Sequence, residues 1–239
     1  MRFVISLFSA LVVAGSAVAP ATGVDRAKEE AENRKFMHDY AKCVVKSDGK
    51  VASEAIVSNA SIVTIFERFP TLVYINCLCR VGGDITKRFG GDIRYALADA
   101  LVNVDFATNN ELDFTNRLPL AHLLAPSQSE LDAALANTKS KRKHLELKER
   151  FDNQVRMAWL SRYGECIVRR DPVKARLWLL TPPDVPEETS RINELRPTFA
   201  ACLGEGTLKF NRATMRGTVA VNYYRLAMAT PQPVAGKSQ

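Results

Sequence analysis

The sequence predicts an all-α protein made of two tandem helical repeats packed as a pseudo-twofold pair. Residues 40–52, "YAKCVVKSDGKVA", are echoed at residues 163–175 as "YGECIVRRDPVKA", with Tyr, Cys, Val, Asp and Ala at the same places. Long stretches of the chain carry apolar side chains at the spacing of one helix face. Glycine and proline separate these stretches, and only residues 84–86 and 207–210 indicate a minor two-stranded β element.

The first residues have the pattern of a secretory signal peptide. Arg2 supplies a positive charge, residues 3–14 form a short apolar run, and small residues follow. We place this signal at residues 1–21, with cleavage after Ala19 or Ala21. A transmembrane anchor is the alternative, but the run is shorter than the roughly 20 apolar residues that span a bilayer. The sequence therefore predicts a periplasmic or secreted protein with no transmembrane segment after cleavage.

The charge of the chain limits the choice of partners. The 239 residues include 33 Lys and Arg against 26 Asp and Glu, and a protein this basic can associate with anionic surfaces. The one compact basic cluster, "KSKRKH" at residues 139–144, lacks the interleaved aromatic side chains of a nucleic-acid interface. It is typical of a solvated loop or helix start. We expect no specific nucleic-acid partner, and either another envelope protein or an anionic surface instead.

A constant offset of 123 residues aligns the two copies well beyond the opening phrase. The matched pairs are Tyr40 and Tyr163, Cys43 and Cys166, Asp48 and Asp171, Cys79 and Cys202, Gly83 and Gly206, and, after the loss of one residue, Arg94 and Arg216. Such ordered matches indicate two divergent copies of one unit, at about residues 36–104 and 159–228. The predicted divisions are a signal peptide (1–21), an N-terminal repeat (22–104), an insertion (105–145), a C-terminal repeat (146–229) and a disordered tail (230–239).

The first copy begins with a predicted helix that Asp25 caps and that carries an apolar stripe along one face. Asp48 and Gly49 break this helix, and a short second helix follows. The next segment is apolar and fits either a helix or a strand, with Pro70 as an interruption. In order, the predicted elements are a helix over residues 26–46, a helix over 50–59, the ambiguous segment 61–78 and a helix over 92–103.

The second copy repeats this order after an insertion whose helix begins at Ser129, a plausible cap. Its long first helix carries an apolar stripe, and Asp171-Pro172 restarts the chain into a short helix. Prolines mark the loop that follows, and the next helix contains Pro197, where we expect a bend. The predicted helices are 129–139 in the insertion, then 143–170, 173–180, 187–203 and 212–228.

The cysteines predict one disulfide in each copy. In an exported chain, the equal separation of 36 residues favours Cys43–Cys79 and Cys166–Cys202. Cys77 is then a free thiol. Because Cys77-Leu78 locally resembles Cys202-Leu203, Cys77 is also an alternative partner for Cys43. Four buried free thiols are the other interpretation.

No metal or cofactor is predicted. The one set of four ligands would be His38, Cys43, Cys77 and Cys79. The second copy has Ser161 where His38 would be, and structural zinc sites have tighter ligand spacing. No hydrolase, metalloprotease or nucleotide-binding motif is present.

Two arginines are the best polar candidates outside the cysteines. Arg94 and Arg216 each open the last helix of their copy. In a structural role, each would bind backbone carbonyls or a carboxylate near the turn, with the repeated Asp48 and Asp171 as candidates. In a functional role, they would form a pair of anion sites.

The tandem order of aromatic residue, "CVV", aspartate, alanine-bearing helix, "CL", glycine and arginine resembles a group of uncharacterised exported α-helical proteins of alphaproteobacteria. The resemblance covers both copies and implies no activity, cofactor or catalytic residue. We therefore expect an exported, non-enzymatic helical protein that binds a partner or supports the envelope. The alternative is an enzyme, either a hydrolase or a thiol-dependent enzyme in which Cys77 acts with His38 or His122.

Overall fold

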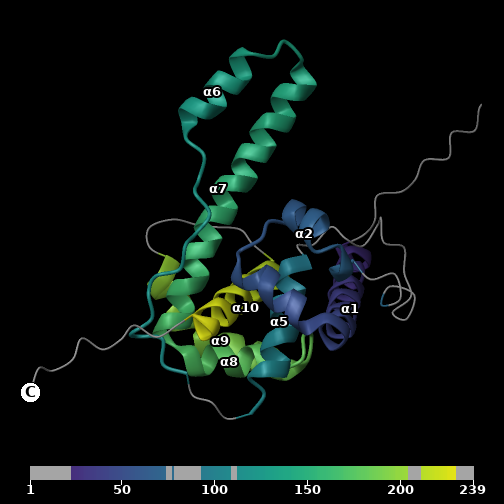
Figure 1. Cartoon of the computed structure of the whole chain (residues 1–239), viewed down its shortest axis with the longest axis vertical. Coiled ribbons are helices and arrows are strands. Elements are labelled where there is room, and N and C mark those ends of the chain that lie inside the picture. Colours follow the sequence, from purple (N-terminus) through teal and green to yellow (C-terminus); the bar gives the residue numbers. More distant parts are fainter. Residues whose placement is uncertain (1–22, 74–76, 78–92, 109–111, 204–210, 230–239) are drawn as a thin grey trace, which may run out of the picture.

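The computed structural model describes residues 23–73, 77, 93–108, 112–203 and 211–229. The predicted signal peptide, the predicted tail, Cys79 and the two short β segments lie outside these residues. Within them, every element is a helix, which confirms the predicted all-α class (Figure 1). No helix in the described part of the chain combines the length and apolar character that a membrane span requires.

The first part of the chain forms α1 (Gly23–Val57), α2 (Ile62–Arg68), the 3-10 helix η1 (Pro70–Leu72) and α5 (Ile93–Asp105). α1 contains both of the first two predicted helices. They meet at Asp48, whose φ of −137° and ψ of 45° are non-helical. The ambiguous segment 61–78 forms α2 and η1 in its described part. Ser61 caps α2, and Pro70 is the first residue of η1, where a backbone N–H would make no hydrogen bond within the helix.

The second part of the chain forms α6 (Gln128–Ala136), α7 (Lys141–Arg170), α8 (Pro172–Leu180), α9 (Pro186–Leu203) and α10 (Arg212–Met228). Asp171 separates α7 from α8 and caps α8. Its φ of −147° and ψ of 71° are close to those of Asp48, its predicted counterpart. The predicted cap of α6 is wrong: Ser127, not Ser129, caps it, because a glutamate three residues after Ser127 completes a capping box.

Two helices, α5 and α10, form the centre of the body (Figure 1). They pack against each other, α1 packs on α5, α7 packs on α10, and α8 contacts both central helices. The largest fully buried side chains include Trp178, Tyr40, Tyr223, Tyr224 and Phe114. The last helix of each predicted copy therefore packs on the long first helix of its own copy and on its counterpart. Two related copies would produce this arrangement, although the repeat itself stays a prediction.

Two glycines allow α10 to approach α5 and α7 closely. A Cβ atom on Gly217 of α10 would lie 2.2 Å from the Cβ of Tyr95 on α5. A Cβ atom on Gly164 of α7 would lie 2.7 Å from the carbonyl oxygen of Thr218 on α10. Both distances are far below van der Waals contact, so larger residues would push these helix pairs apart.

Candidate functional site

A cleft of about 850 Å³ opens where α1, α5, α7 and α10 meet. This volume is within the range of small-molecule sites in proteins, roughly 300–1,000 Å³. Apolar atoms form most of its wall, with contributions from Met37, Tyr95, Leu123, Leu124 and Met157. Its polar lining includes Arg34, His38, Arg94, Asp99, Arg156 and Arg216. The cleft thus combines an apolar wall with several cationic groups.

Arg216 lines the cleft from α10 and is 6% exposed. Its Nε donates to Asp99 Oδ1 at 3.0 Å, and its Nη1 donates to Glu188 Oε1 at 3.2 Å. It also donates to the backbone carbonyls of Trp178 at 3.2 Å and Leu179 at 2.6 Å. One buried guanidinium is therefore balanced by two carboxylates, and it ties α10 to α5, α8 and α9.

Arg216 thus contacts backbone carbonyls and carboxylates, as expected for a structural role, but its carboxylate partners are Asp99 and Glu188 and not Asp171. Asp171 instead pairs with Lys174 Nζ at 2.6 Å and accepts the Lys174 N–H as the cap of α8. A capping carboxylate points at the N–H groups of its own helix, so it is not available to Arg216. In the first copy, Asp48 Oδ2 is buried and has no hydrogen-bond partner among the described residues.

Arg94 lines the same cleft from the first turn of α5 and is 8% exposed. Its Nη1 donates to the carbonyl of Ala60 at 3.4 Å, and its guanidinium carbon lies 6.0 Å from the centre of the Tyr95 ring. The two arginines that the repeat singled out, Arg94 and Arg216, therefore line one common cleft.

Two further arginines of the cleft have no signal in the sequence. Arg34 of α1 binds both carboxylate oxygens of Asp184, at 2.8 and 2.9 Å, and this hydrogen bonding raises the pKa of Arg34. Arg156 of α7 is exposed and donates to Asn153 Oδ1 at 2.7 Å. No carboxylate pairs with Arg156 within the described ranges. Neither arginine belongs to a motif, and they line one cleft only because α1 packs on α5 and α7 packs on α10.

His38, which the sequence presents as a candidate metal ligand together with Cys43, Cys77 and Cys79, also lines the cleft. Its Nδ1 lies 3.5 Å from Asp99 Oδ2. Asp99 is thus shared between His38 and Arg216. In the part of the chain that the structure describes, no three side chains of histidine, cysteine, aspartate or glutamate are placed together as a metal site would need.

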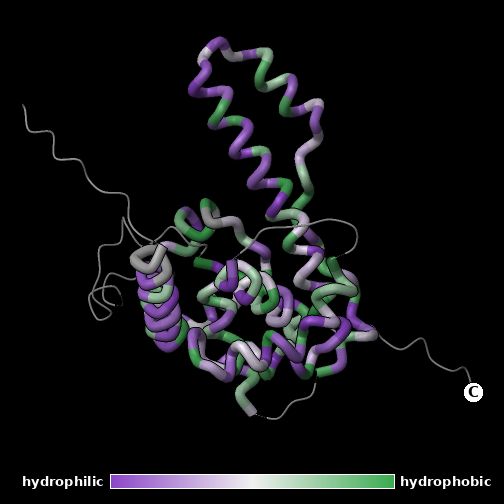
Figure 2. Tube along the Cα trace, turned by 180° about the vertical axis from the view of Figure 1, so that it is seen from behind, coloured by the Kyte–Doolittle hydropathy of each residue, from purple (hydrophilic) through white to green (hydrophobic). Residues whose placement is uncertain are grey.

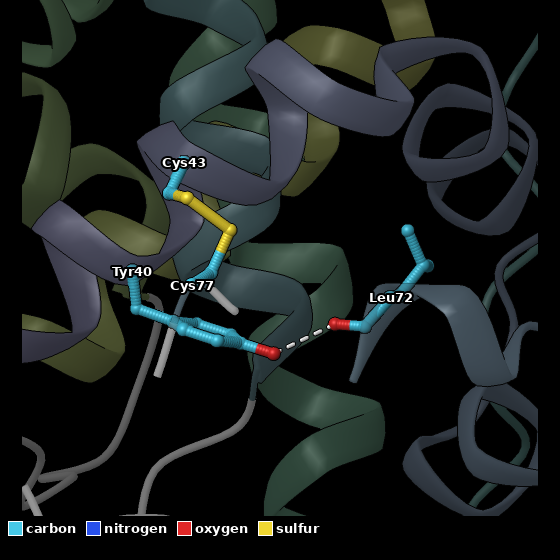
Figure 3. The surroundings of a disulfide bond; sticks show 4 residues. All are labelled: Tyr40, Cys43, Leu72 and Cys77. Atoms are coloured by element: carbon cyan, nitrogen blue, oxygen red, sulfur yellow. Dashed lines mark hydrogen bonds between the residues drawn. A yellow bond between two sulfur atoms is a disulfide. The ribbon is translucent and has the colours of Figure 1, made fainter. Parts of the chain in front are cut away.

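The four bonded cysteines are not among the described residues that line the cleft, and one of the two pairings differs from the prediction. Cys166 pairs with Cys202 as expected, but Cys43 pairs with Cys77 and not with Cys79 (Figure 3). Cys77 is 1% exposed and bonded, so it is not a free thiol. The prediction of Cys79 rested on an equal distance from the second cysteine to the glycine turn in the two predicted copies, and with Cys77 as the partner these distances are unequal. The local match of Cys77-Leu78 with Cys202-Leu203 was the better guide.

A tyrosine lies about one helical turn before Cys43 and before Cys166, and its hydroxyl adds a hydrogen bond between the same two segments that the disulfide joins. Tyr40 Oη donates to the carbonyl of Leu72 at 2.8 Å, beside the Cys43–Cys77 bond (Figure 3). In the second copy, Tyr163 Oη donates to the carbonyl of Phe199 at 3.3 Å. The two tyrosines thus bind the long first helix of each predicted copy to a residue that lies shortly before the second cysteine of the disulfide.

A second polar cluster joins the insertion to α7. His122 Nδ1 lies 2.7 Å from Ser161 Oγ, and His122 Nε2 lies 2.5 Å from Glu165 Oε2. Glu165 also accepts from Arg169 Nε at 2.6 Å and from the Leu120 N–H at 3.2 Å. Arg169 in turn donates to the backbone carbonyls of Phe114, Arg117 and Leu118. This cluster therefore holds residues 114–122 against α7.

This cluster predicts a loss of stability at acid pH. Burial raises the pKa of Glu165, but hydrogen bonds from His122, Arg169 and the Leu120 N–H outweigh burial and lower the pKa below its usual value. The stabilisation is therefore present above the pKa of an unfolded glutamate, and it is lost as the pH falls through the lower pKa of the folded state. We expect Glu165→Gln to flatten the fall in unfolding free energy below about pH 5, measured by urea unfolding at each pH. An unchanged pH slope would show that this carboxylate is not held as described.

No known protein family, curated protein or solved structure matches this chain. The fold and the site by themselves define a helical, disulfide-bonded protein with a partly cationic, mostly apolar cleft. Its two disulfides indicate folding in an oxidising compartment.

Proposed function

We propose that this chain is an exported, non-enzymatic binding protein of the periplasm or cell envelope, and that its cleft takes a small anionic ligand with an apolar part. The observation that carries the proposal is the cleft itself, which has the volume of a small-molecule site and to which the described residues contribute four arginines. The predicted signal peptide and the two disulfides support export.

The composition of the cleft favours an amphipathic anion. Its described lining contains Arg34, Arg94, Arg156 and Arg216 against the carboxylates Glu30 and Asp99. The guanidinium of Arg216 already binds the buried carboxylates of Asp99 and Glu188. Arg156 is exposed, and among the described residues it hydrogen-bonds only the neutral amide of Asn153. An anionic group at Arg156 would leave the apolar remainder of the ligand against Met157, Leu123 and Tyr95.

The test measures binding of dodecyl phosphate and of dodecyltrimethylammonium by isothermal titration calorimetry. We expect the anion to bind more tightly than the cation. Arg156→Glu should weaken anion binding by at least about tenfold, because a hydrogen bond to a charged group contributes roughly 1.5–3 kcal/mol. Arg162→Glu is the matched control, since Arg162 is exposed on the same helix and does not line the cleft. Equal binding of both surfactants, or equal losses in both variants, would refute the proposal.

A hydrolase is the second candidate, because the side chains of Ser161, His122 and Glu165 form a hydrogen-bonded series of serine, histidine and carboxylate. Two features favour a structural role for these three side chains. Ser161 lies inside α7, where backbone N–H groups are bonded within the helix and do not form an oxyanion hole. The hollow that Ser161 borders is about 20 Å³, enough for a water molecule but not for an acyl substrate. We expect a fluorophosphonate probe to leave Ser161 unlabelled, as mass spectrometry would show; labelling would favour the hydrolase.

A thiol-dependent enzyme that uses Cys77 is no longer a candidate, because Cys77 is bonded to Cys43.

A further inference from the structure

A two-helix arm projects from the body of the protein (Figure 1). It consists of α6 and the N-terminal half of α7, joined by residues 137–140 at its tip. None of the side chains of α6 is buried, and the buried side chains of α7 begin at Ala158. Figure 2 shows hydrophilic positions interspersed with hydrophobic ones along the whole arm. The arm therefore adds nothing to the core of the body.

The tip of the arm concentrates positive charge. Its exposed basic side chains are Lys139, Lys141, Arg142 and Lys143. Glu146 pairs with Arg142 at 3.0 Å, so residues 139–146 carry four positive charges and one negative charge, a net of +3 with His144 neutral. Within the described residues, no acidic side chain pairs with the three lysines.

This charge lies where the helix itself disfavours it. α7 begins at Lys141, and its first turn contains basic side chains and no acidic one. The N-terminus of a helix carries a partial positive charge, so cations there reduce stability and anions are attracted. The fold thus has no need of this cluster, whereas a negatively charged partner would be bound both by the side chains and by the helix end.

An exposed leucine lies among these cations. Leu145 is 69% exposed and sits four residues after Lys141 and three after Arg142, so the three share one face of α7. A cationic helix face that also presents an apolar side chain is suited to the interface of an anionic bilayer. The tip contains no Phe, Tyr or Trp between residues 137 and 150, which disfavours a nucleic acid as its partner.

We propose that the tip of the arm, residues 139–145, docks on the surface of an anionic lipid bilayer. The projecting arm lets the tip meet a flat surface before the body does (Figure 1). The lysines lie near the lipid phosphates, and Leu145 inserts among the headgroups. This docking is independent of any ligand in the cleft, whose described lining on α7 begins only at Asn153, about two helical turns beyond Leu145.

The test is co-sedimentation of the full exported chain with vesicles of phosphatidylcholine, with or without phosphatidylglycerol. We expect binding only when phosphatidylglycerol is present, and weaker binding as salt is added. The variant Lys139→Gln, Lys141→Gln, Lys143→Gln should bind roughly a hundredfold more weakly, since each cation near such a surface contributes about a factor of five. The matched control is Lys42→Gln, Lys46→Gln, Lys50→Gln, which removes three exposed lysines from α1 and should bind like the unchanged chain.

Leu145→Asn separates a bilayer from a general polyanion. We expect it to weaken binding to phosphatidylglycerol vesicles several-fold and to leave retention on a phosphocellulose column unchanged, because only a bilayer offers an apolar interior. Circular dichroism should match that of the unchanged chain for every variant, and no variant should melt more than a few degrees lower, since all the altered side chains are exposed. Absence of vesicle binding, equal losses in the α1 control, or equally tight tip-dependent binding of a single-stranded oligonucleotide would overturn the proposal.

Discussion

Replacing Arg216 with methionine is expected to lower the free energy of unfolding by about 3–5 kcal/mol. Methionine fills much of the space but leaves Asp99 without its cation and Glu188 with one partner fewer, both deep in the protein. The carbonyls of Trp178 and Leu179 lose a donor as well. A buried carboxylate that has lost its partner retains its full desolvation cost. Urea unfolding followed by circular dichroism measures the change.

Arg156→Met is the control for this prediction. It removes the same group from an exposed arginine of the same cleft, and we expect a change within about 0.5 kcal/mol. A double-mutant cycle of Arg216→Met with Asp99→Asn should give a coupling free energy of roughly 0.5–3 kcal/mol, because the two side chains share one hydrogen-bonded network. A loss below about 1 kcal/mol for Arg216→Met would mean that the network does not form in solution.

Removing the second disulfide should cost nearly as much. Cys166→Ala with Cys202→Ala opens a loop whose ends are 36 residues apart, and the loop-entropy relation predicts a loss of about 3–4 kcal/mol. The same relation gives a similar value for Cys43→Ala with Cys77→Ala, which opens a loop of 34 residues. Unfolding by guanidinium chloride without reductant measures both values.

Cys79→Ala is the matched control, because it removes the cysteine that lies closest in sequence to Cys77. We expect its stability to stay within about 0.5 kcal/mol of the unchanged chain, with both disulfides detected by mass spectrometry. Fragmentation of the linked peptide between Cys77 and Cys79 identifies which of them is joined to Cys43. A Cys43–Cys79 bond, together with a large loss in Cys79→Ala, would contradict the pairing in the structure.

The helices were largely predictable because their signals are local. The apolar stripe around Tyr40 and Tyr163, and the breaks at Asp48 and Asp171, depend on residues within a few turns of each other. Segment 61–78 was the exception. Its continuous apolar character fits a strand as well as a helix, and in its described part only the contact of η1 with α1 and the cap at Ser61 decide for helix.

The cleft was only partly predictable. The repeat pointed to Arg94 and Arg216, and both line it. Their partners could not be inferred, because Asp99 lies 117 residues from Arg216 and belongs to no motif. The cluster of His122 with Ser161 and Glu165 was missed for the same reason, since His122 comes from a segment that reads as a loop. The spacing of Ser161 and Glu165 on one helix face was the single available signal, and it is common on helices.

The sequence by itself determined the helical class, the positions of most helices and the presence of a paired cysteine in each half, because periodicity, capping and turn residues act over short distances. It also predicts export, through a pattern confined to the first residues. Only the tertiary structure decided that Cys77 is the partner of Cys43, which carboxylates neutralise Arg216, and that a cleft and a projecting arm exist. These features depend on how close distant elements come when their apolar faces are buried together, and no local pattern specifies that distance.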